Sequence, residues 1–147
     1  MFPGVYGCVV SHGCMCCDSL GADGIGSTSI SGPPVLVHLC TAVQWQAARH
    51  SGEHRPDSLR EVGFVHLSSP EQVHLPANRL YGGRTDLMLL RLDAARLCSP
   101  VYWEPGIPTD PDGMVFPHLY GPLPVAAVIS ATAYLPDRHG VFTPCAG

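Results

Sequence analysis

The segment Gly63-Phe64-Val65-His66-Leu67-Ser68 predicts a β-strand near the middle of the chain. It combines β-branched and aromatic residues, begins with a glycine, and is followed by a serine and a proline. Alternate side chains of a strand point to opposite faces of its sheet, so Phe64, His66 and Ser68 share one face. This strand therefore places an aromatic ring, an imidazole and a hydroxyl together.

Five further strands are predicted around this segment, from short runs of apolar and β-branched residues. They cover residues 35–40, 86–92, 101–104, 114–118 and 125–134. The chain lacks a repeating βαβα order, which argues against a doubly wound parallel sheet. The predicted fold class is α+β, with a mostly antiparallel sheet and two short helices.

The helices are predicted between the early strands. A helix over residues 41–50 begins at a capping threonine and is followed by a glycine. Single helical turns are expected at residues 57–61 and 93–96. A further helix is expected over residues 69–80, starting at Ser-Pro, but Pro76 predicts a kink or a break within it.

Composition excludes several classes of protein. The 147 residues are 46% hydrophobic and only 14% charged, with a net charge of −4. All eight basic residues are arginines, so a lysine Schiff base and a lysine-containing phosphate loop are both excluded. The acidic balance argues against nucleic acid as a partner. No apolar run approaches the roughly 18 residues that span a bilayer, so we expect no membrane partner.

The chain divides into three predicted regions: a Gly/Ser/Cys-rich flexible leader at 1–34, a folded domain at 35–136 and an irregular tail at 137–147. The leader lacks the positive region and apolar run of a secretory signal. Its cysteines lack the paired spacing of zinc motifs, so a disordered leader is favoured over a metal site. An odd total of seven cysteines further favours a reduced, cytoplasmic protein. The leader cysteines are Cys8, Cys14, Cys16 and Cys17.

Three histidines lie within predicted strands: His38, His66 and His118. A lone histidine in an apolar strand is usually a hydrogen-bonded core residue. Three in one small sheet weaken that interpretation, because each needs its own buried partner. Glu104 lies at the end of a predicted strand among bulky side chains, where it is either desolvated, paired with a cation, or directed into solvent.

Several motifs together resemble one bacterial family, catalogued as domain of unknown function 952. The resemblance covers about residues 35–136. It rests on His38, Trp45, Gln72 and three motifs: Pro56-Asp57-Ser58-Leu59, residues 63–68 and Phe116-Pro117-His118-Leu119-Tyr120-Gly121-Pro122-Leu123. Pro76 departs from the family pattern, in which a helix continues.

That family resembles the ADP-ribosyltransferases, which implies a split, twisted sheet around a cleft that binds NAD. The resemblance implies that His38, on the first strand, holds a ribose and that Glu104 or His118 stabilises positive charge or acts as a base. Phe64 or Tyr120 would then stack on nicotinamide. The residues implied for catalysis are His38, Glu104 and His118, and those implied for cofactor binding are Ser58, Phe64, His66, Ser68, Gln72 and Tyr120.

Three functions follow as expectations. The first is NAD-dependent transfer or hydrolysis on a nucleotide-like small molecule, with Arg55 or Arg84 contacting the diphosphate. The second is a metal-dependent hydrolase with His38, His66 and His118 as ligands. The third is a non-catalytic module that binds a small metabolite or nucleotide in the same cleft. The sequence leaves the oligomeric state and the acceptor open.

Overall fold

The computed structural model describes residues 35–108 and 110–145. The predictions for the leader and its four cysteines lie outside these residues. Within them, no helix is long and apolar enough to cross a membrane. The predicted α+β class is confirmed: antiparallel sheets are combined with a few short helices.

The first sheet is built from three antiparallel strands in the order β1-β4-β8. These are β1 (Leu36–Thr41), β4 (Leu87–Leu92) and β8 (Val128–Ala133). Helix α3 (Ala42–Ser51) follows β1 directly and contacts both β1 and β4. Thr41 caps this helix as predicted, because its hydroxyl accepts from the Gln44 amide while the Gln44 side chain accepts from the Thr41 amide.

The second sheet has the order β3-β6-β5 and is also antiparallel. Its strands are β3 (Val65–His66), β6 (Val115–Leu119) and β5 (Val101–Pro105). Its register places His66 opposite His118 and His118 opposite Tyr102. A two-residue pair, β2 (Glu53–His54) with β7 (Leu123–Pro124), was not predicted.

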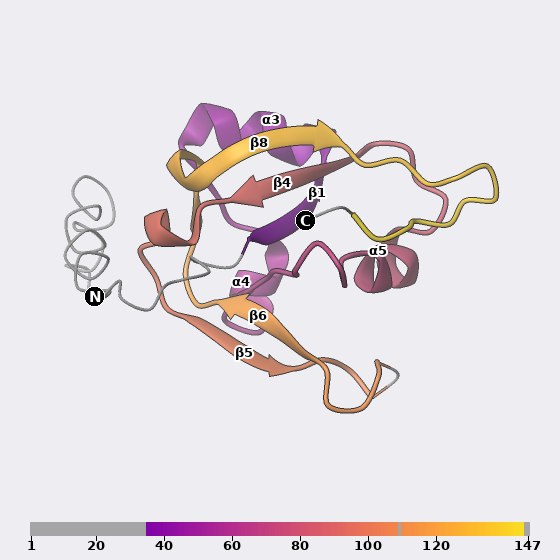
Figure 1. The fold of residues 1–147 in the computed structure, drawn as a ribbon. Coiled ribbons are helices and arrows are strands. Elements are labelled where there is room, and N and C mark those ends of the chain that lie inside the picture. The colour runs from indigo at the N-terminus through magenta and orange to yellow at the C-terminus, as the bar shows by residue number, and fades with distance from the viewer. Residues whose placement is uncertain (1–34, 109, 146–147) are drawn as a thin grey trace.

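The two larger sheets meet at Val37 of β1 and Ser68, just after β3. Two backbone hydrogen bonds, of 2.8 and 2.9 Å, join these residues in antiparallel fashion. Figure 1 shows the β1-β4-β8 sheet and the β5-β6 hairpin at opposite ends of the molecule, with helices α4 (Asp57–Glu61) and α5 (His74–Tyr81) in the region between them. The segment that follows Phe64 therefore pairs first with β6 and then with β1.

This double pairing corrects the prediction of one continuous strand over residues 63–68. Only Val65 and His66 form ladder pairs with β6, because the chain then turns toward β1 at Ser68. The predicted strand over residues 125–134 is similarly shortened. Its first residues form the 3-10 turn η4 (Val125–Ala127), and a matching turn η3 (Ala94–Arg96) occurs where one was predicted.

The two remaining helices are α4 (Asp57–Glu61), as predicted, and α5 (His74–Tyr81). The expected kink at Pro76 is wrong. Residues 70–73 form turns, so α5 begins later than predicted and Pro76 is its third residue. Amide groups in the first turn of a helix have no intrahelical acceptor, so a proline there breaks no hydrogen bond.

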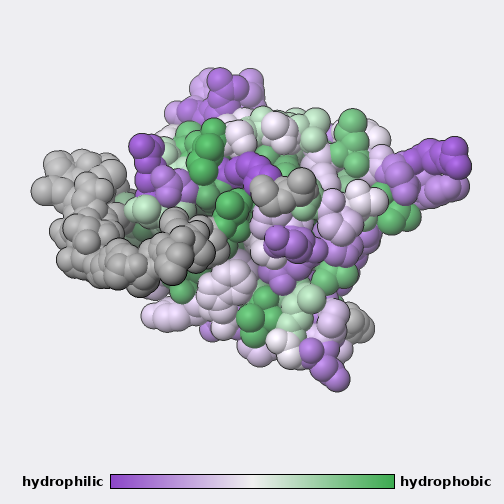
Figure 2. Space-filling view, viewed as in Figure 1, coloured by the Kyte–Doolittle hydropathy of each residue, from purple (hydrophilic) through white to green (hydrophobic). Residues whose placement is uncertain are grey.

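The core consists of two groups of buried apolar side chains. The larger lies between the two sheets and includes Leu90, Leu119 and Leu123. The smaller packs around α5 and includes Phe142, which is 1% exposed although its segment forms no helix or strand. On the face shown in Figure 2, hydrophobic and hydrophilic residues are intermixed rather than segregated.

Candidate functional site

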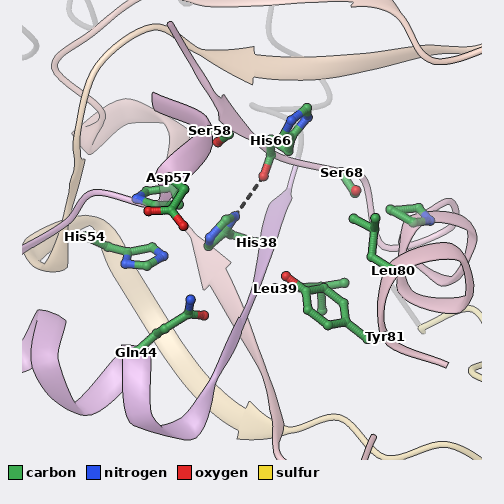
Figure 3. A pocket seen from close by; sticks show the side chains of 12 residues that line it. His38, Leu39, Gln44, His54, Asp57, Ser58, His66, Ser68, Leu80 and Tyr81 are labelled. Carbon is green, nitrogen blue, oxygen red and sulfur yellow. Dashed lines mark hydrogen bonds between the residues drawn. The ribbon is translucent and has the colours of Figure 1, made fainter. Parts of the chain in front are cut away.

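A cavity of about 260 Å³ lies where β1, β2, α4 and α5 come together. Figure 3 shows His38 near its centre, with Gln44, His54 and Asp57 on one side and Leu80 and Tyr81 on the other. Its lining comprises His38, Leu39, Gln44, His54, Pro56, Asp57, Ser58, His66, Ser68, Pro76, Leu80 and Tyr81.

His38 is held in one orientation by a backbone contact. Its Nδ1 lies 2.7 Å from the carbonyl oxygen of His66, whose ring points the other way (Figure 3). A carbonyl oxygen only accepts, so Nδ1 carries the proton and donates it to this bond. The other ring nitrogen, Nε2, is then a lone-pair acceptor, and it is buried without a hydrogen-bond partner.

Burial also fixes the charge of this ring. The His38 side chain is 6% exposed, and desolvation lowers its pKa from 6.5 to about 3, with the nearby His54 adding to the effect. The imidazole is therefore neutral at physiological pH. A buried acceptor with no partner is costly, which makes it the clearest sign of a ligand site in the described chain.

A second buried histidine, His54, lies beside His38. The two ring centroids lie 5.1 Å apart, and Nε2 of His54 is likewise buried without a partner. Desolvation lowers its pKa as well. The sequence analysis missed this residue because it lies on the two-residue strand β2, which is too short to leave a periodic pattern. The only available signal was a histidine flanked by charged residues in a segment without predicted structure.

A second cavity, of about 420 Å³, adjoins the first and extends toward β5 and β6. The two cavities share four lining residues: His66, Ser68, Pro76 and Leu80. The second is mainly apolar and is completed by Phe64, Leu67, Arg79, Pro105, Gly106, Ile107, Asp110, Phe116 and His118. The common wall of the two cavities is therefore formed by the segment that ends at Ser68 and by α5.

His118 in the second cavity is bonded to a carboxylate. Its Nδ1 lies 2.7 Å from Oε1 of Glu104, and the same oxygen accepts from the Tyr120 hydroxyl at 2.8 Å. These two bonds lower the pKa of Glu104, His118 contributing most, so the carboxylate is ionised at neutral pH. Phe64 stacks on the His118 ring with centroids 4.0 Å apart. Glu104 thus has two specific partners, His118 and Tyr120, although its side chain remains 37% exposed.

A third, more open cavity of about 460 Å³ adjoins the first on its other side. It shares Gln44, His54, Pro56 and Asp57 with the first cavity, and it also includes Arg55. Three cavities therefore lie next to one another, with His38 in the middle one. Such a series suits an elongated ligand better than a compact one.

The structure brings most of the predicted site residues together. His38, Ser58, His66 and Ser68 line the first cavity. Phe64 and His118 line the second, while Glu104 and Tyr120 lie behind His118 and line neither.

Gln72 is placed differently from the other predicted residues. Its amide donates to the Val115 carbonyl and accepts from the Ser69 backbone, and it lines neither cavity. The structure therefore shows Gln72 bonding the turn before α5 to β6.

The three-histidine metal site is not supported by this geometry. His38 and His118 line different cavities, and only His66 lines both. Among residues 35–108 and 110–145, no group of three histidine, cysteine or acidic side chains is arranged to hold a metal ion. The strand register explains this. His66 is the strand partner of His118, and it is the backbone carbonyl of His66, not its ring, that contacts His38.

The predicted phosphate contacts are only partly placed at the cavities. Arg55 lines the third cavity and is paired with Glu53, whereas Arg84 is paired with Asp86 and lines none of the three. Arg79, which was not predicted, lines the second cavity and bonds Asp110 at 3.1 Å. Each of these guanidinium groups therefore already has a carboxylate partner.

Comparison with known proteins places this fold in a family. The model of one family, described as "Protein of unknown function (DUF952)", matches residues 39–131. The chain belongs to the DUF952 family. The match begins one residue after His38 and reaches into β8, so it spans both sheets.

Solved structures of one similar protein share this fold. The crystal structure of protein CC0527 from Caulobacter crescentus is 30% identical, with a TM-score of 0.62 over 74% of this chain and 93% of that chain. The solution NMR structure of CC0527 is also 30% identical, with a TM-score of 0.61 over 73% and 90% of the two chains. Among curated proteins, none matches this DUF952 chain.

Proposed function

We propose that this protein binds an NAD-like nucleotide along the series of cavities and transfers its ADP-ribosyl group. One observation carries the proposal: the neutral His38 ring presents a buried, unpartnered Nε2 in the first cavity. Such an acceptor pairs with a ligand group that donates a hydrogen bond and carries no charge. A ribose hydroxyl is such a group.

His54 strengthens the assignment to a sugar. Two neighbouring unpartnered ring nitrogens, on rings 5.1 Å apart, match a ligand with two adjacent hydroxyls, each able to donate or accept, better than a ligand with one. A ribose with free 2′- and 3′-hydroxyls provides such a pair. Desolvation lowers the pKa of both rings and so favours their neutral forms.

The length of the cavity series supports a dinucleotide. The ribose at His38 would have one ligand arm in the second cavity, beside Phe64 and His118, and the other in the third, beside Arg55. Phe64 and His118 offer aromatic faces to a planar base. The sheet junction between Val37 and Ser68 is consistent with the split sheet implied by the resemblance to ADP-ribosyltransferases.

A non-catalytic binding module is the second candidate. Glu104, the carboxylate implied for catalysis, lines neither the first nor the second cavity. Arg55 and Arg79 are already paired with carboxylates. The same cavities could therefore hold a nucleotide without altering it.

Two measurements separate these functions. Titration with NAD, ADP-ribose and 2′-deoxy analogues, followed by NMR, should shift amide signals of the first cavity, with the 2′-deoxy forms binding more weakly. Nicotinamide release from NAD should then be detectable and fall at least tenfold in Glu104→Gln. Binding with no release under any condition would establish the module, and absence of binding would exclude both.

A further inference from the structure

We propose that the second cavity is a separate binding site for a small, uncharged alcohol with an apolar body, whose hydroxyl donates a hydrogen bond to His118. The volume of about 420 Å³ lies within the usual range for small-molecule sites. The binding of this alcohol needs no nucleotide. In the proposed function one arm of NAD lies in this same cavity, so NAD and the alcohol would compete for it.

The polar chemistry of the cavity starts from the His118–Glu104 bond. An ionised carboxylate only accepts, so the hydrogen bond of 2.7 Å places a proton on Nδ1 of His118. In the neutral ring, Nε2 then carries a lone pair. Among the described residues, the structure shows no hydrogen bond to this nitrogen. A ligand hydroxyl can therefore donate a hydrogen bond to Nε2, as happens at other histidines that are oriented by a carboxylate.

Contacts on several sides fix the orientation of the His118 ring. Phe64 stacks on one face of the ring, His66 lies edge-on at 5.5 Å, and Glu104 is itself held by Tyr120. These contacts leave the ring little rotational freedom, so its free nitrogen has a defined direction. A fixed acceptor selects ligands by the position of their donor.

The remaining lining argues for an uncharged, apolar ligand body. Leu67, Pro105, Ile107 and Phe116 supply mostly carbon surface. Charge is balanced within the wall, because Asp110 has a side chain only 7% exposed and is bonded to Arg79. A ligand carboxylate or ammonium would have to break this pair or remain uncompensated, and both are costly.

The test uses four ring compounds of similar size and three variants. Benzyl alcohol, added without NAD, should shift the amide signals of Leu67, Ile107 and Phe116 in NMR spectra. Toluene, which lacks the hydroxyl, should bind at least about fivefold more weakly, and benzoate and benzylamine should give no saturable shift there. His118→Phe keeps an aromatic ring on Phe64 and should abolish the preference for benzyl alcohol over toluene.

Two isoleucine variants test the location. Ile107→Trp narrows the cavity and should weaken benzyl alcohol binding at least tenfold, whereas Ile129→Trp on β8 should not change it. Both side chains are exposed, at 41% and 65%, so both variants are expected to fold. Equal binding of toluene and benzyl alcohol, no saturable shift at the three amides, or insensitivity to Ile107→Trp would overturn the proposal. A failed NAD titration would leave these results unchanged and would refute only the proposed function.

Discussion

The His66 carbonyl oxygen lies 2.7 Å from Nδ1 of His38, and this bond determines which nitrogen of the buried ring faces the ligand cavity. It links the edge of one sheet to the first strand of the other. Because the acceptor is a backbone atom, it persists whatever side chain occupies position 66. The tautomer of His38 is therefore a property of the fold.

Burial of a neutral His38 makes stability depend on pH. In the unfolded chain this histidine takes up a proton near pH 6.5, whereas in the folded protein it resists protonation down to about pH 3. Its contribution is therefore complete above pH 6.5 and is lost as the pH falls toward 3. For one such group the free energy of unfolding falls by about 1.4 kcal/mol per pH unit in this window.

Urea unfolding at several pH values between 7 and 4.5 measures this effect. His38→Gln should have a shallower fall than the wild type, while His50→Gln, at an exposed histidine of α3, should follow the wild type. Desolvation of His54 adds to the fall of the unfolding free energy in the wild type and in His38→Gln alike. Identical slopes for wild type and His38→Gln would show that His38 is not protected from protonation.

His54→Phe should weaken ligand binding and stabilise the folded state. The substitution removes a buried nitrogen that has no partner, which stabilises the folded state by about 1 kcal/mol, and it also removes a hydrogen-bonding group for the ligand. Chemical denaturation should show the gain in stability, and calorimetry should show at least tenfold weaker NAD binding. A variant that binds NAD like the wild type would remove His54 from the site.

Tyr120→Phe should raise the pKa of Glu104 toward its ordinary value. The tyrosine hydroxyl donates to the carboxylate at 2.8 Å and stabilises its ionised form. A pH titration of the Glu104 carboxyl carbon by NMR measures the change. Tyr102→Phe is the control, because Tyr102 contacts the Tyr120 ring rather than the carboxylate. A pKa that is unchanged in Tyr120→Phe would contradict the bond.

Asn78→Ala should loosen the segment around Phe142. The Asn78 side chain donates to the Phe142 carbonyl at 3.0 Å and accepts from the Phe142 amide at 2.8 Å. Loss of both bonds should cost about 2 kcal/mol of unfolding free energy. Hydrogen exchange at the Phe142 amide should accelerate more than exchange at amides of β4. Equal acceleration at both places would instead indicate that only global stability had changed.

The sequence predicted those elements that leave a local signal. The helix after Thr41 was predicted because its cap and following glycine are local, and the strand around Leu90 because it is continuously apolar. The segment 63–68 was predicted as a strand, but its change of partner at Ser68 was not. Alternation shows which side chains share a face, and it carries no information about which strand lies alongside.

The site was predicted in part for the same reason. His38 and His118 stood out because they interrupt apolar strands, whereas His54 lies on a strand of two residues. Phe142 could not be recognised as a core residue, because its burial depends on Asn78, 64 residues away. That His38 and His118 line adjacent cavities depends on the junction at Ser68, which is a tertiary contact.

The most direct test of the account is calorimetric titration of NAD into the wild type, His38→Gln and His50→Gln. The account predicts saturable binding to the wild type and to His50→Gln, and binding at least tenfold weaker to His38→Gln. Absence of saturable binding to the wild type, or equal affinity in His38→Gln, would contradict the claim that the unpartnered nitrogen of His38 receives the ligand.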